Sequence, residues 1–479
     1  MNLTLAAHSL GGANELICFG GEHFDGKLTR FFNDLYRVEL RQRDTVLQWR
    51  QVTSSTNPAP RSSHQACITS GQQVFLFGGE FGTSRETKFF HYRDFWQLDL
   101  KTYAWAELTD TVKPLPGPRS GHRMALWKHV IALFGGFYDA GADTKYLDDL
   151  WLFDTREHRW TRADWLNDAN CRPSARSGFH LVPVDTGLLL YGGYCQARGK
   201  GGAATGQVLT DMWHLRVDTE DLRRTRWEKR KISGAAASPQ PRSGGCSVAS
   251  RSGRSFYLFG GVVDEDISEE FLNGTCLNDL WEFSVERGQW RQLAPRNAPV
   301  PRYNAALSLL GSKLVLFAGI HEHEDRQYVL DDCWVLNVDK IDGADGWQCV
   351  RKLSVDLSTW QGDSDSDGSD GSDGSDDSDE SDEEDSSGDE SDDSEDQTDS
   401  EYEDDDAQAR RPCAMDPSVP LPCPGQTLRD YFSAHQPFWQ QRAQALHPTL
   451  TNSKQLRGEA FVLAQQAFNE FDLDRLLLK

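Results

Sequence analysis

Five arginines recur in the same short context along this chain and are the first candidates for chemistry. Each follows a proline or an alanine and precedes a serine or a tyrosine: Arg61, Arg119, Arg176, Arg242 and Arg302. Histidines lie three residues after the first two of them, at His64 and His122. Because function tends to reside in loops held by a rigid scaffold, we predict that these seven side chains bind a partner. The alternative is that they hydrogen-bond within and between repeated units, since repeated residues usually serve the repeated architecture.

Residues 321–325, with the sequence His-Glu-His-Glu-Asp, could grip a metal ion. A charged, solvated loop is the ordinary explanation of such a run. No glycine pair fits the Gly-x-x-x-x-Gly-Lys-Ser/Thr pattern of a phosphate-binding loop. We therefore predict no catalytic residue, no bound metal and no cofactor.

The arginines belong to a larger repeat. Six apolar runs end in an aromatic residue followed by two small residues, and these pairs recur every 57 or 58 positions, with one interval of 68. Such a period indicates repeated structural units. Glycine in the pairs permits a positive φ angle and lets a neighbouring aromatic ring approach the backbone. We predict this structural role for Gly20, Gly21, Gly78, Gly79, Gly135, Gly136, Gly192, Gly193, Gly260, Gly261 and Gly319.

Each repeat has the pattern of four short strands. Runs such as 74–77 and 188–191 are apolar at consecutive positions, which a strand needs only when both of its faces are covered. After every small-residue pair comes an acidic residue with an aromatic residue two positions later, which we call the acidic-aromatic step. Each repeat then ends in a closing tryptophan: Trp49, Trp105, Trp160, Trp227, Trp290 and Trp347. These rings bring large buried areas to contacts between neighbouring sheets. Six such units arranged radially give an all-β, six-bladed β-propeller.

The blades are predicted at roughly 3–52, 58–108, 116–163, 173–230, 240–294 and 300–352. Each holds its own four strands, so we expect the ring to close by side-chain packing between the first and last blades. Closure in which the N-terminal strand completes the last blade is the alternative. We divide the chain into the propeller (1–352), a disordered acidic linker (353–425) and a small helical domain (426–479).

The acidic linker accounts for the net charge of −24. Between 363 and 406 there are 25 Asp or Glu and no Lys or Arg, which leaves 49 acidic residues against 50 basic ones elsewhere. Such a composition cannot offset the entropy of ordering, so we predict disorder. Nucleic acid is not expected as a direct ligand, because the folded part has no basic excess and the linker repels phosphates. Basic proteins such as histones or ribosomal proteins are the expected partners of the linker, and a solubilising tether is the alternative.

After a proline-rich stretch at 412–424 the pattern becomes helical. We predict one helix from Thr427, a second with Pro437 in its first turn, and a third from about Ser453 with one apolar face. Three short helices bury little surface alone, so docking on the propeller or on a partner is expected. A self-contained bundle is the alternative.

Three stretches carry a resemblance to a known family: 80–82 with 90–94, 119–124, and 330–332 with 336–340. With the small-residue pairs and closing tryptophans, they resemble the kelch repeat proteins, and among them kelch domain-containing protein 4 and its fungal relatives. The resemblance covers 3–352 and resumes in the C-terminal helices. It implies a kelch propeller without established catalytic activity, whose ligand-reading residues cluster near the recurrent arginines. Relatives usually have a basic N-terminal extension that this sequence lacks.

An enzyme is the main rival within that resemblance, because one class of copper radical oxidase uses a kelch propeller. Copper chemistry needs a positioned set of His, Tyr and Cys, and no such set can be assembled from matching motifs in this chain. Ten cysteines lie singly along the chain, which favours a reducing compartment. No apolar run approaches the roughly 18 residues that span a bilayer, and the N-terminus is not a persuasive signal peptide. We expect a soluble cytoplasmic protein, with the nucleus as the alternative, and no membrane partner.

These observations predict a non-enzymatic protein–protein interaction scaffold or adaptor that uses the loop-rich face of the propeller. A chaperone-like binder of histones or ribosomal proteins, acting through the acidic linker, is one alternative. A kelch-fold, metal-dependent oxidase is the other.

Overall fold

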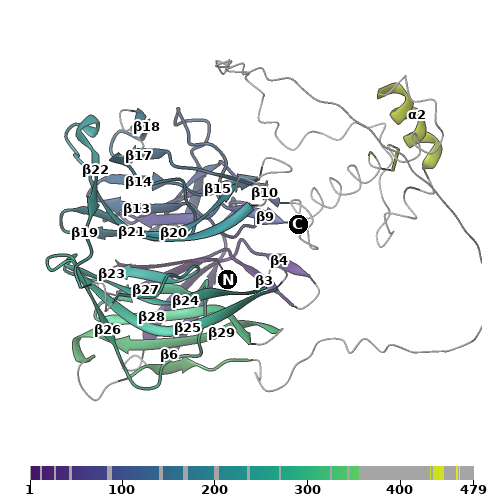
Figure 1. The fold of residues 1–479 in the computed structure, drawn as a ribbon. Helices are drawn as coiled ribbons and strands as arrows, with labels where there is room; N and C mark the ends of the chain where they lie inside the picture. The colour runs from purple at the N-terminus through teal and green to yellow at the C-terminus, as the bar shows by residue number, and fades with distance from the viewer. Residues whose placement is uncertain are drawn as a thin grey trace, which may run out of the picture. The chain divides into compact units, whose positions relative to one another are not determined.

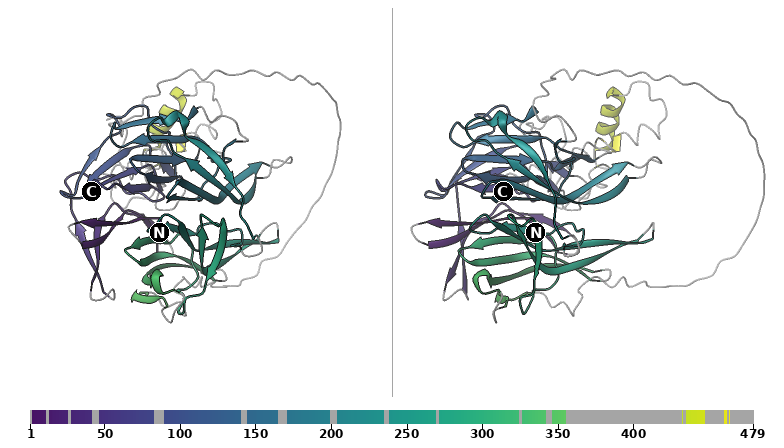
Figure 2. Two further views of the ribbon diagram at one scale, coloured as in Figure 1. Left: turned by 90° about the vertical axis from the view of Figure 1, so that its left-hand side faces the viewer. Right: turned by 60° about the vertical axis from the view of Figure 1, so that its left-hand side comes forward.

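The computed structural model of this protein describes residues 2–10, 13–25, 28–41, 46–82, 89–139, 144–164, 171–198, 204–234, 238–268, 271–323, 326–341, 346–354, 432, 435–446, 460–461 and 463. The chain divides into two compact units, Met1–Gln361 and Gly362–Lys479. The first unit is built from six four-stranded antiparallel sheets, drawn in Figure 1 with labels on part of their strands and from two further directions in Figure 2. The prediction of an all-β, six-bladed propeller is confirmed.

The four strands of each blade follow one another from the inside of the ring outward. In blades one to three they are β1 (Thr4–Leu10), β2 (Ala13–Phe19), β5 (Leu35–Arg41) and β6 (Val46–Val52); β7 (Gln65–Ile68), β8 (Gln73–Phe77), β11 (Phe95–Asp99) and β12 (Ala104–Glu107); and β13 (Arg123–Trp127), β14 (Val130–Phe134), β17 (Leu150–Asp154) and β18 (Arg159–Arg162).

Blades four to six follow the same order with longer middle strands. They contain β19 (His180–Val184), β20 (Gly187–Arg198), β21 (Ala204–Arg216) and β22 (Arg226–Arg230); β23 (Cys246–Ala249), β24 (Ser255–Ser268), β25 (Phe271–Ser284) and β26 (Gln289–Leu293); and β27 (Ala306–Leu310), β28 (Lys313–His323), β29 (Arg326–Asn337) and β30 (Gln348–Arg351). Two short 3₁₀ helices, η3 (Leu222–Arg224) and η5 (Val338–Lys340), lie in turns before the outermost strands of blades four and six.

The core lies between neighbouring blades. Strand β14 is buried at all five positions, as expected of a strand covered on both faces. On one side of it, Ile131 and Leu133 join a cluster with Phe75 and Phe77 of blade two. On its other side, the core cluster extends to residues of blade four. Burial of these apolar side chains against the next sheet therefore holds each blade in place.

The ring closes by packing, as predicted. The innermost strands contact one another in the order β1, β7, β13, β19, β23 and β27, and β27 contacts β1. Each sheet contains four consecutive blade strands, so no strand is exchanged between the first and last blades. Leu16 and Cys18 of blade one share a core cluster with Val315 and Cys333 of blade six. The alternative closure by an N-terminal strand in the last blade is excluded by this strand order.

The small-residue pairs mark the point where each middle strand turns into a protruding hairpin. All eleven predicted glycines, together with Ala318, have positive φ angles. In blades one to three the hairpins are separate: β3 (Glu22–Phe24) with β4 (Thr29–Phe31), β9 (Glu80–Gly82) with β10 (Phe89–His91), and β15 (Phe137–Asp139) with β16 (Thr144–Tyr146). In blades four to six the hairpins continue the middle strands, and the pairing register shifts at the small-residue pair.

The C-terminal unit contains one described helix, α2 (Gln436–Leu446). Pro437 lies in its first turn, as predicted. Trp439 and Ala443 are buried and cluster with Phe432 and Ala460. The linker predicted at 353–425 lies outside the described residues beyond 354. The predicted helices from Thr427 and Ser453 also lie mostly outside them.

Candidate functional site

The hairpins that follow the small-residue pairs share one face of the propeller, which we call the hairpin face. Figure 1 shows β3, β4, β9, β10 and β15 projecting on the same side of the ring. In blades two to six, a single β-bridge joins the base of the hairpin to the residue after the recurrent arginine: Ser62–Glu80, Ser120–Phe137, Ser177–Tyr194, Ser243–Val262 and Tyr303–Ile320. The arginine segments of blades two to six therefore lie at the base of this face.

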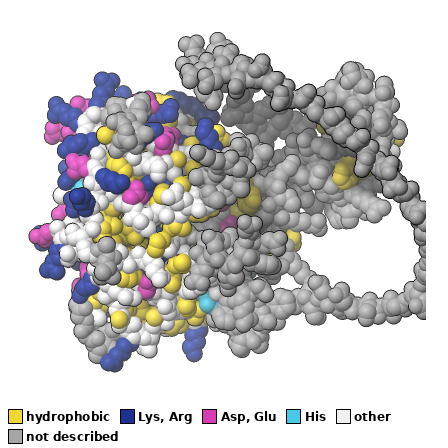
Figure 3. All heavy atoms as spheres, in the orientation of Figure 1, with side chains coloured by type: hydrophobic (Ala, Val, Ile, Leu, Met, Phe, Trp, Pro, Cys, Tyr) yellow, Lys and Arg dark blue, Asp and Glu magenta, His cyan; other side chains and the backbone are white. Residues whose placement is uncertain are grey.

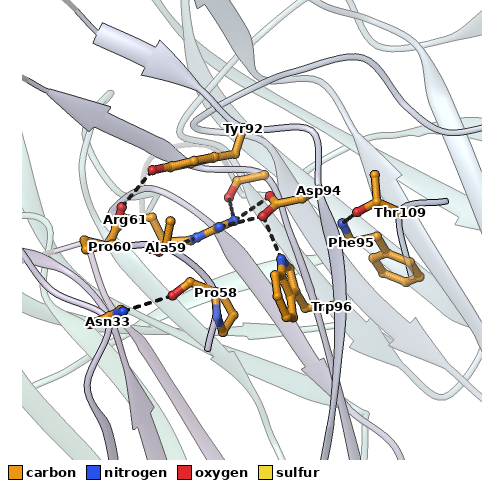
Figure 4. Close-up of polar contacts among 11 residues, drawn as sticks. Asn33, Pro58, Ala59, Pro60, Arg61, Tyr92, Asp94, Phe95, Trp96 and Thr109 are labelled. Atoms are coloured by element: carbon orange, nitrogen blue, oxygen red, sulfur yellow. Dashed lines mark hydrogen bonds and ion pairs between the residues drawn. The ribbon is translucent and has the colours of Figure 1, made fainter. Parts of the chain in front are cut away.

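Each recurrent arginine forms a bidentate ion pair with the aspartate of the acidic-aromatic step in its own blade. In blade two, Arg61 Nη1 and Nη2 donate to the two carboxylate oxygens of Asp94, both at 2.7 Å (Figure 4). Arg61 Nη1 also donates to the carbonyl of Gly78 at 3.0 Å, and Trp96 Nε1 donates to Asp94 at 2.6 Å. The same set recurs in Arg119–Asp149–Trp151, Arg176–Asp211–Trp213, Arg242–Asp279–Trp281 and Arg302–Asp332–Trp334.

The arginines of these ion pairs are buried, so each needs its aspartate as a partner. The five arginine side chains are at most 3% exposed. Burial raises the pKa of Asp149, but the hydrogen bonds and charge of Arg119 and the bond from Trp151 outweigh it, so this pKa is lowered. The pKa of Asp211 is lowered in the same way by Arg176 and Trp213. Paired and fully hydrogen-bonded, these charges are tolerated inside the protein, whereas an unpaired one is not.

The backbone of four of these arginines connects the blade of that arginine to the preceding blade. Arg61 N donates to the carbonyl of Phe32 at 3.1 Å, and Gly21 N donates to the carbonyl of Arg61 at 2.9 Å. Equivalent bonds from the second glycine of the preceding blade reach Arg119, Arg176 and Arg302. These are the contacts within and between blades that the structural interpretation requires. Partner binding by the five arginines stays a prediction, and their guanidinium groups have almost no exposed surface to support it.

The two histidines are buried beside the glycine pairs. A β-carbon on Gly20 would stand 2.9 Å from His64 Cε1, and one on Gly78 would stand 2.9 Å from His122 Cε1. The predicted close approach of an aromatic ring to the glycine backbone is therefore present. Burial, with the nearby arginines, lowers the pKa of His64 to about 3 and that of His122 well below its usual value. Both rings are thus neutral and inaccessible to a partner in this structure.

An exposed apolar patch on the hairpin face was missed by sequence reasoning. Its members are the only exposed large hydrophobic residues among the described positions: Leu28, Phe32, Phe89 and Phe90, which are 37–57% exposed. They lie on or next to the hairpins of blades one and two, whose strands β4 and β9 are in contact. Consecutive aromatics at 89–90 were a usable signal, because a short hairpin strand can bury only one of them.

The apolar patch is supported from below by ordered aromatic contacts. The Phe90 and Tyr92 rings meet edge to face at 5.1 Å, and the Arg61 guanidinium lies 4.1 Å from the centre of the Tyr92 ring. The rings of Phe31 and Phe81, from the two hairpins, lie 5.1 Å apart. The ring of Tyr92 therefore connects the apolar patch to the buried Arg61–Asp94 ion pair.

A polar network lies beside the patch. Ser62 Oγ donates to Glu22, Ser63 Oγ donates to Glu80, and each bond is 2.8 Å long. His91 Nδ1 lies 2.8 Å from Ser120 Oγ. Burial and the charge of Glu22 raise the pKa of Glu80 to about 7, although the hydrogen bond from Ser63 opposes them. Glu80 therefore changes charge near neutral pH.

The candidate metal segment has other partners where it is described. His321 Nδ1 lies 2.8 Å from the carbonyl of Pro301, and Glu322 accepts hydrogen bonds from the hydroxyl of Tyr303 and from Gln327. The side chains of residues 323–325 lie outside the described set. Within the described part of the chain, no three His, Cys, Asp or Glu side chains are grouped to hold a metal ion. In that same part, no helix has the length and apolarity to span a bilayer.

Comparison with known proteins gives matches over the propeller. The model of the KLHDC2/KLHL20/DRC7 Kelch-repeats domain matches residues 6–221 and 201–351. Human host cell factor 2 is 30% identical over 232 residues, covering 43% of this chain and 28% of that protein. The Drosophila melanogaster homologue of leucine-zipper-like transcriptional regulator 1 is 26% identical over 318 residues, covering 65% of this chain and 29% of that protein.

Tip elongation aberrant protein 1 of Schizosaccharomyces pombe is 25% identical over 322 residues, covering 57% of this chain and 26% of that protein. The chain thus spans less than a third of the length of each of these three relatives. Among solved structures, that of YjhT aligns with a TM-score of 0.46 at 16% identity, covering 69% of this chain and 96% of that one.

Proposed function

Because this chain belongs to the KLHDC2/KLHL20/DRC7 kelch-repeat family, we propose that it is a non-enzymatic interaction scaffold whose hairpin face binds a partner protein. One observation carries the proposal: the apolar patch of Leu28, Phe32, Phe89 and Phe90 on two adjacent hairpins. Exposed apolar groups gathered in this way mark interaction surfaces, whereas scattered single ones do not. The partner that fits is a protein segment presenting its own apolar side chains, since polar ligands gain nothing from such a surface.

The polar residues at the edge of the patch fit a protein partner. On the side of the propeller that Figure 3 displays, basic and acidic side chains are interspersed without a continuous basic stripe. At the edge of the patch, Asp25 and Arg30 form an ion pair of 3.6 Å, and the Asp25 carboxylate accepts from Leu28 N at 2.9 Å. An apolar centre with a mixed polar rim is the usual anatomy of a protein–protein interface.

The test is a double substitution, Phe89→Ser with Phe90→Ser, in the full chain. The partner is first identified by affinity purification and mass spectrometry, and its affinity is then measured with purified components. We expect at least a tenfold loss of affinity, because a few aromatic anchors carry most interface energy. The matched control, Lys101→Ser with Glu107→Ser, changes two exposed residues of the same blade and is expected to bind normally.

Two outcomes would contradict the scaffold. Wild-type affinity in the phenylalanine variant, with its circular dichroism unchanged, would remove the hairpin face from the interface. Stoichiometric copper or iron in the purified protein, together with oxidase activity, would favour an enzyme instead.

The acidic linker suggests a second class of partner. Its 25 acidic residues between 363 and 406, uninterrupted by basic ones, favour basic proteins. Deletion of 363–406 is expected to remove co-purified basic proteins and to spare partners of the apolar patch. The finer resemblance to kelch domain-containing protein 4 and a location in the reducing cytoplasm are also part of this proposal. Imaging of the tagged full chain tests the location.

A further inference from the structure

One mostly buried carboxylate lies between the hairpins of blades one, two and three. Glu80 is on β9, directly across from His91 of β10, in the hairpin that presents Phe89 and Phe90. The Glu80 side chain is 14% exposed. Its backbone forms the β-bridge with Ser62 at the entry to blade two. Glu80 is therefore held at the base of the hairpin that carries half of the apolar patch.

On one side, the hairpin of blade two is linked to that of blade three. Asp139 N of β15 donates to His91 Nε2 at 3.2 Å, so the neutral ring carries its proton on Nδ1. His91 Nδ1 then donates to Ser120 Oγ at 2.8 Å and lies 3.8 Å from Glu80 Oε2. The His91 ring also meets Phe137 edge to face at 5.6 Å. These contacts connect β10 to β15 beside the Glu80 carboxylate.

On the other side, the hairpin of blade one presents a second carboxylate. Ser63 Oγ donates to Glu80, and the neighbouring Ser62 Oγ donates to Glu22 of β3, each at 2.8 Å. Asn2 Nδ2 donates to Glu22 at 2.7 Å. Strands β4 and β9 of these two hairpins are in contact. Because the apolar patch has members from both hairpins, it is continuous only while they stay together.

The surroundings of Glu80 do not compensate a negative charge. Among the described residues, no lysine or arginine forms an ion pair with Glu80, and the titratable groups that face it are Glu22, His91 and Asp139. Burial lowers the pKa of His91 although Asp139 opposes this, so the ring is uncharged at neutral pH. Burial, with the charges of Glu22 and Asp139, raises the pKa of Glu80 to about 7 against hydrogen bonds from two serines. Ionisation of Glu80 thus adds a third carboxylate between two others, and like charges repel.

We propose that the proton on Glu80 holds the first three hairpins together and so keeps the apolar patch assembled. When Glu80 ionises, repulsion from Glu22 and Asp139 loosens the hairpin of blade two. Phe89 and Phe90 then no longer share a fixed surface with the hairpin of blade one. Binding at the apolar patch therefore weakens as pH rises through neutrality. Only this last consequence rests on the proposed function.

Hydrogen–deuterium exchange of the full chain at pH 6 and pH 8 tests the link without any partner. The rates are corrected for the pH dependence of chemical exchange, and the hairpin of blade six, 319–323 with 326–330, is the internal reference. We expect amide protection in 80–82 and 89–91 of the wild type to fall about threefold or more from pH 6 to pH 8, because exchange there reports local opening. The reference hairpin should keep its protection.

Three variants assign the effect to Glu80. Glu80→Gln stays neutral and keeps an acceptor for Ser63, so its hairpins should be equally protected at both pH values. Glu22→Gln removes one of the repelling charges and should show a smaller loss than the wild type. Glu107→Gln changes an exposed residue of the same blade and should behave like the wild type.

A second measurement is the affinity of the partner that requires Phe89 and Phe90. The wild type should bind it up to about tenfold more weakly at pH 8 than at pH 6, because apparent affinity scales with the fraction of binding-competent molecules. Glu80→Gln should bind it equally at both pH values.

The outcomes separate this proposal from the proposed function. Equal protection of the wild-type hairpins at both pH values, or the same loss in Glu80→Gln, would overturn the link. An equal loss in the hairpin of blade six would also overturn it, since it would indicate general destabilisation. A hairpin response with unchanged affinity would remove the regulation of binding. If no partner required Phe89 and Phe90, the proposed function would fail, and the exchange data would still decide the link. Should Glu80→Gln fail to fold, Glu22→Gln provides the comparison.

Discussion

The indole ring of Trp49 packs against the phenyl ring of Phe317, with ring centres 5.0 Å apart, and so joins the first blade to the last. The other five closing tryptophans make the same contact with the aromatic residue of the preceding blade: Trp105–Phe19, Trp160–Phe77, Trp227–Phe134, Trp290–Tyr191 and Trp347–Phe259. The ring is thus closed by the same contact that stacks each blade on its neighbour.

Replacing Trp49 with alanine is expected to weaken ring closure. The substitution removes the contact with Phe317 and leaves a cavity between blades one and six, which costs about 3 kcal/mol of unfolding free energy. Urea unfolding measures this loss. Trp49→Phe keeps a ring in the cavity and should recover more than half of it. An unchanged urea midpoint for Trp49→Ala would mean that the ring is closed by other contacts.

His122→Phe is expected to stabilise the protein. Both ring nitrogens of His122 are buried without a partner. Blade four places Phe179 at the equivalent position, where its ring lies against Gly135 of the preceding blade as His122 lies against Gly78. Removing an unsatisfied buried donor contributes about 1 kcal/mol. As a control, His64→Phe loses the 2.9 Å bond to Thr4 Oγ1 and should gain less.

His122→Phe should also change how the unfolding free energy of the protein depends on pH. Because the pKa of His122 is lowered in the folded state, the unfolded chain takes up a proton first as pH falls. The stability that this neutral ring contributes is complete above about pH 6.5 and is lost as pH falls below that value. His122→Phe should therefore lose less stability between pH 7 and pH 5. Parallel pH profiles for wild type and variant would contradict this account.

Arg302→Met is expected to destabilise the propeller strongly. Arg302 and Asp332 are 0% and 3% exposed, so the substitution leaves a buried carboxylate without its cation. Breaking such a pair costs about 3–5 kcal/mol. Arg291→Met breaks an exposed pair with Glu282 and should change the unfolding free energy by less than about 1 kcal/mol. If chemical denaturation gave equal losses of unfolding free energy for the two substitutions, burial would not determine how much an ion pair contributes to stability.

Glu80→Gln should remove a pH dependence near neutrality. The pKa of Glu80 is raised from its usual value of 4.5 to about 7 in the folded protein. The stability that the protonated side chain contributes is therefore complete below about pH 4.5 and is lost as pH rises through about 7. Glutamine stays neutral and keeps an acceptor for Ser63. The variant should match the wild type at pH 4.5 and exceed it at pH 8 by at most about 3 kcal/mol. Glu107→Gln, an exposed residue of the same blade, is the control in these thermal unfolding profiles.

Much of the fold could be predicted from the sequence. The spacing of the glycine pairs and the consecutive apolar runs predicted six blades of four strands, because a regular period and two-sided burial leave few other architectures. The closing tryptophans were predicted to lie between sheets, and Trp160 and Trp347 are buried there. Pro437 marked the first turn of a helix.

The functional site could not be found in the same way. The sequence singled out both Arg61 and Asp94, which are 33 residues apart, but nothing in their spacing shows that they pair. The apolar patch is only partly visible in the sequence: the consecutive aromatics Phe89 and Phe90 were a signal, but nothing in the sequence shows that both stay exposed on a hairpin beside that of Leu28 and Phe32.

The sequence by itself determined the repeat, the blade number and the charge division between propeller and linker, because each is a property of residues close together in the chain. Only the tertiary structure decided which arginines have a counter-charge and which aromatics remain exposed. Those properties depend on what distant segments bring into contact: Asp149 reaches Arg119, whereas no described carboxylate reaches Arg123.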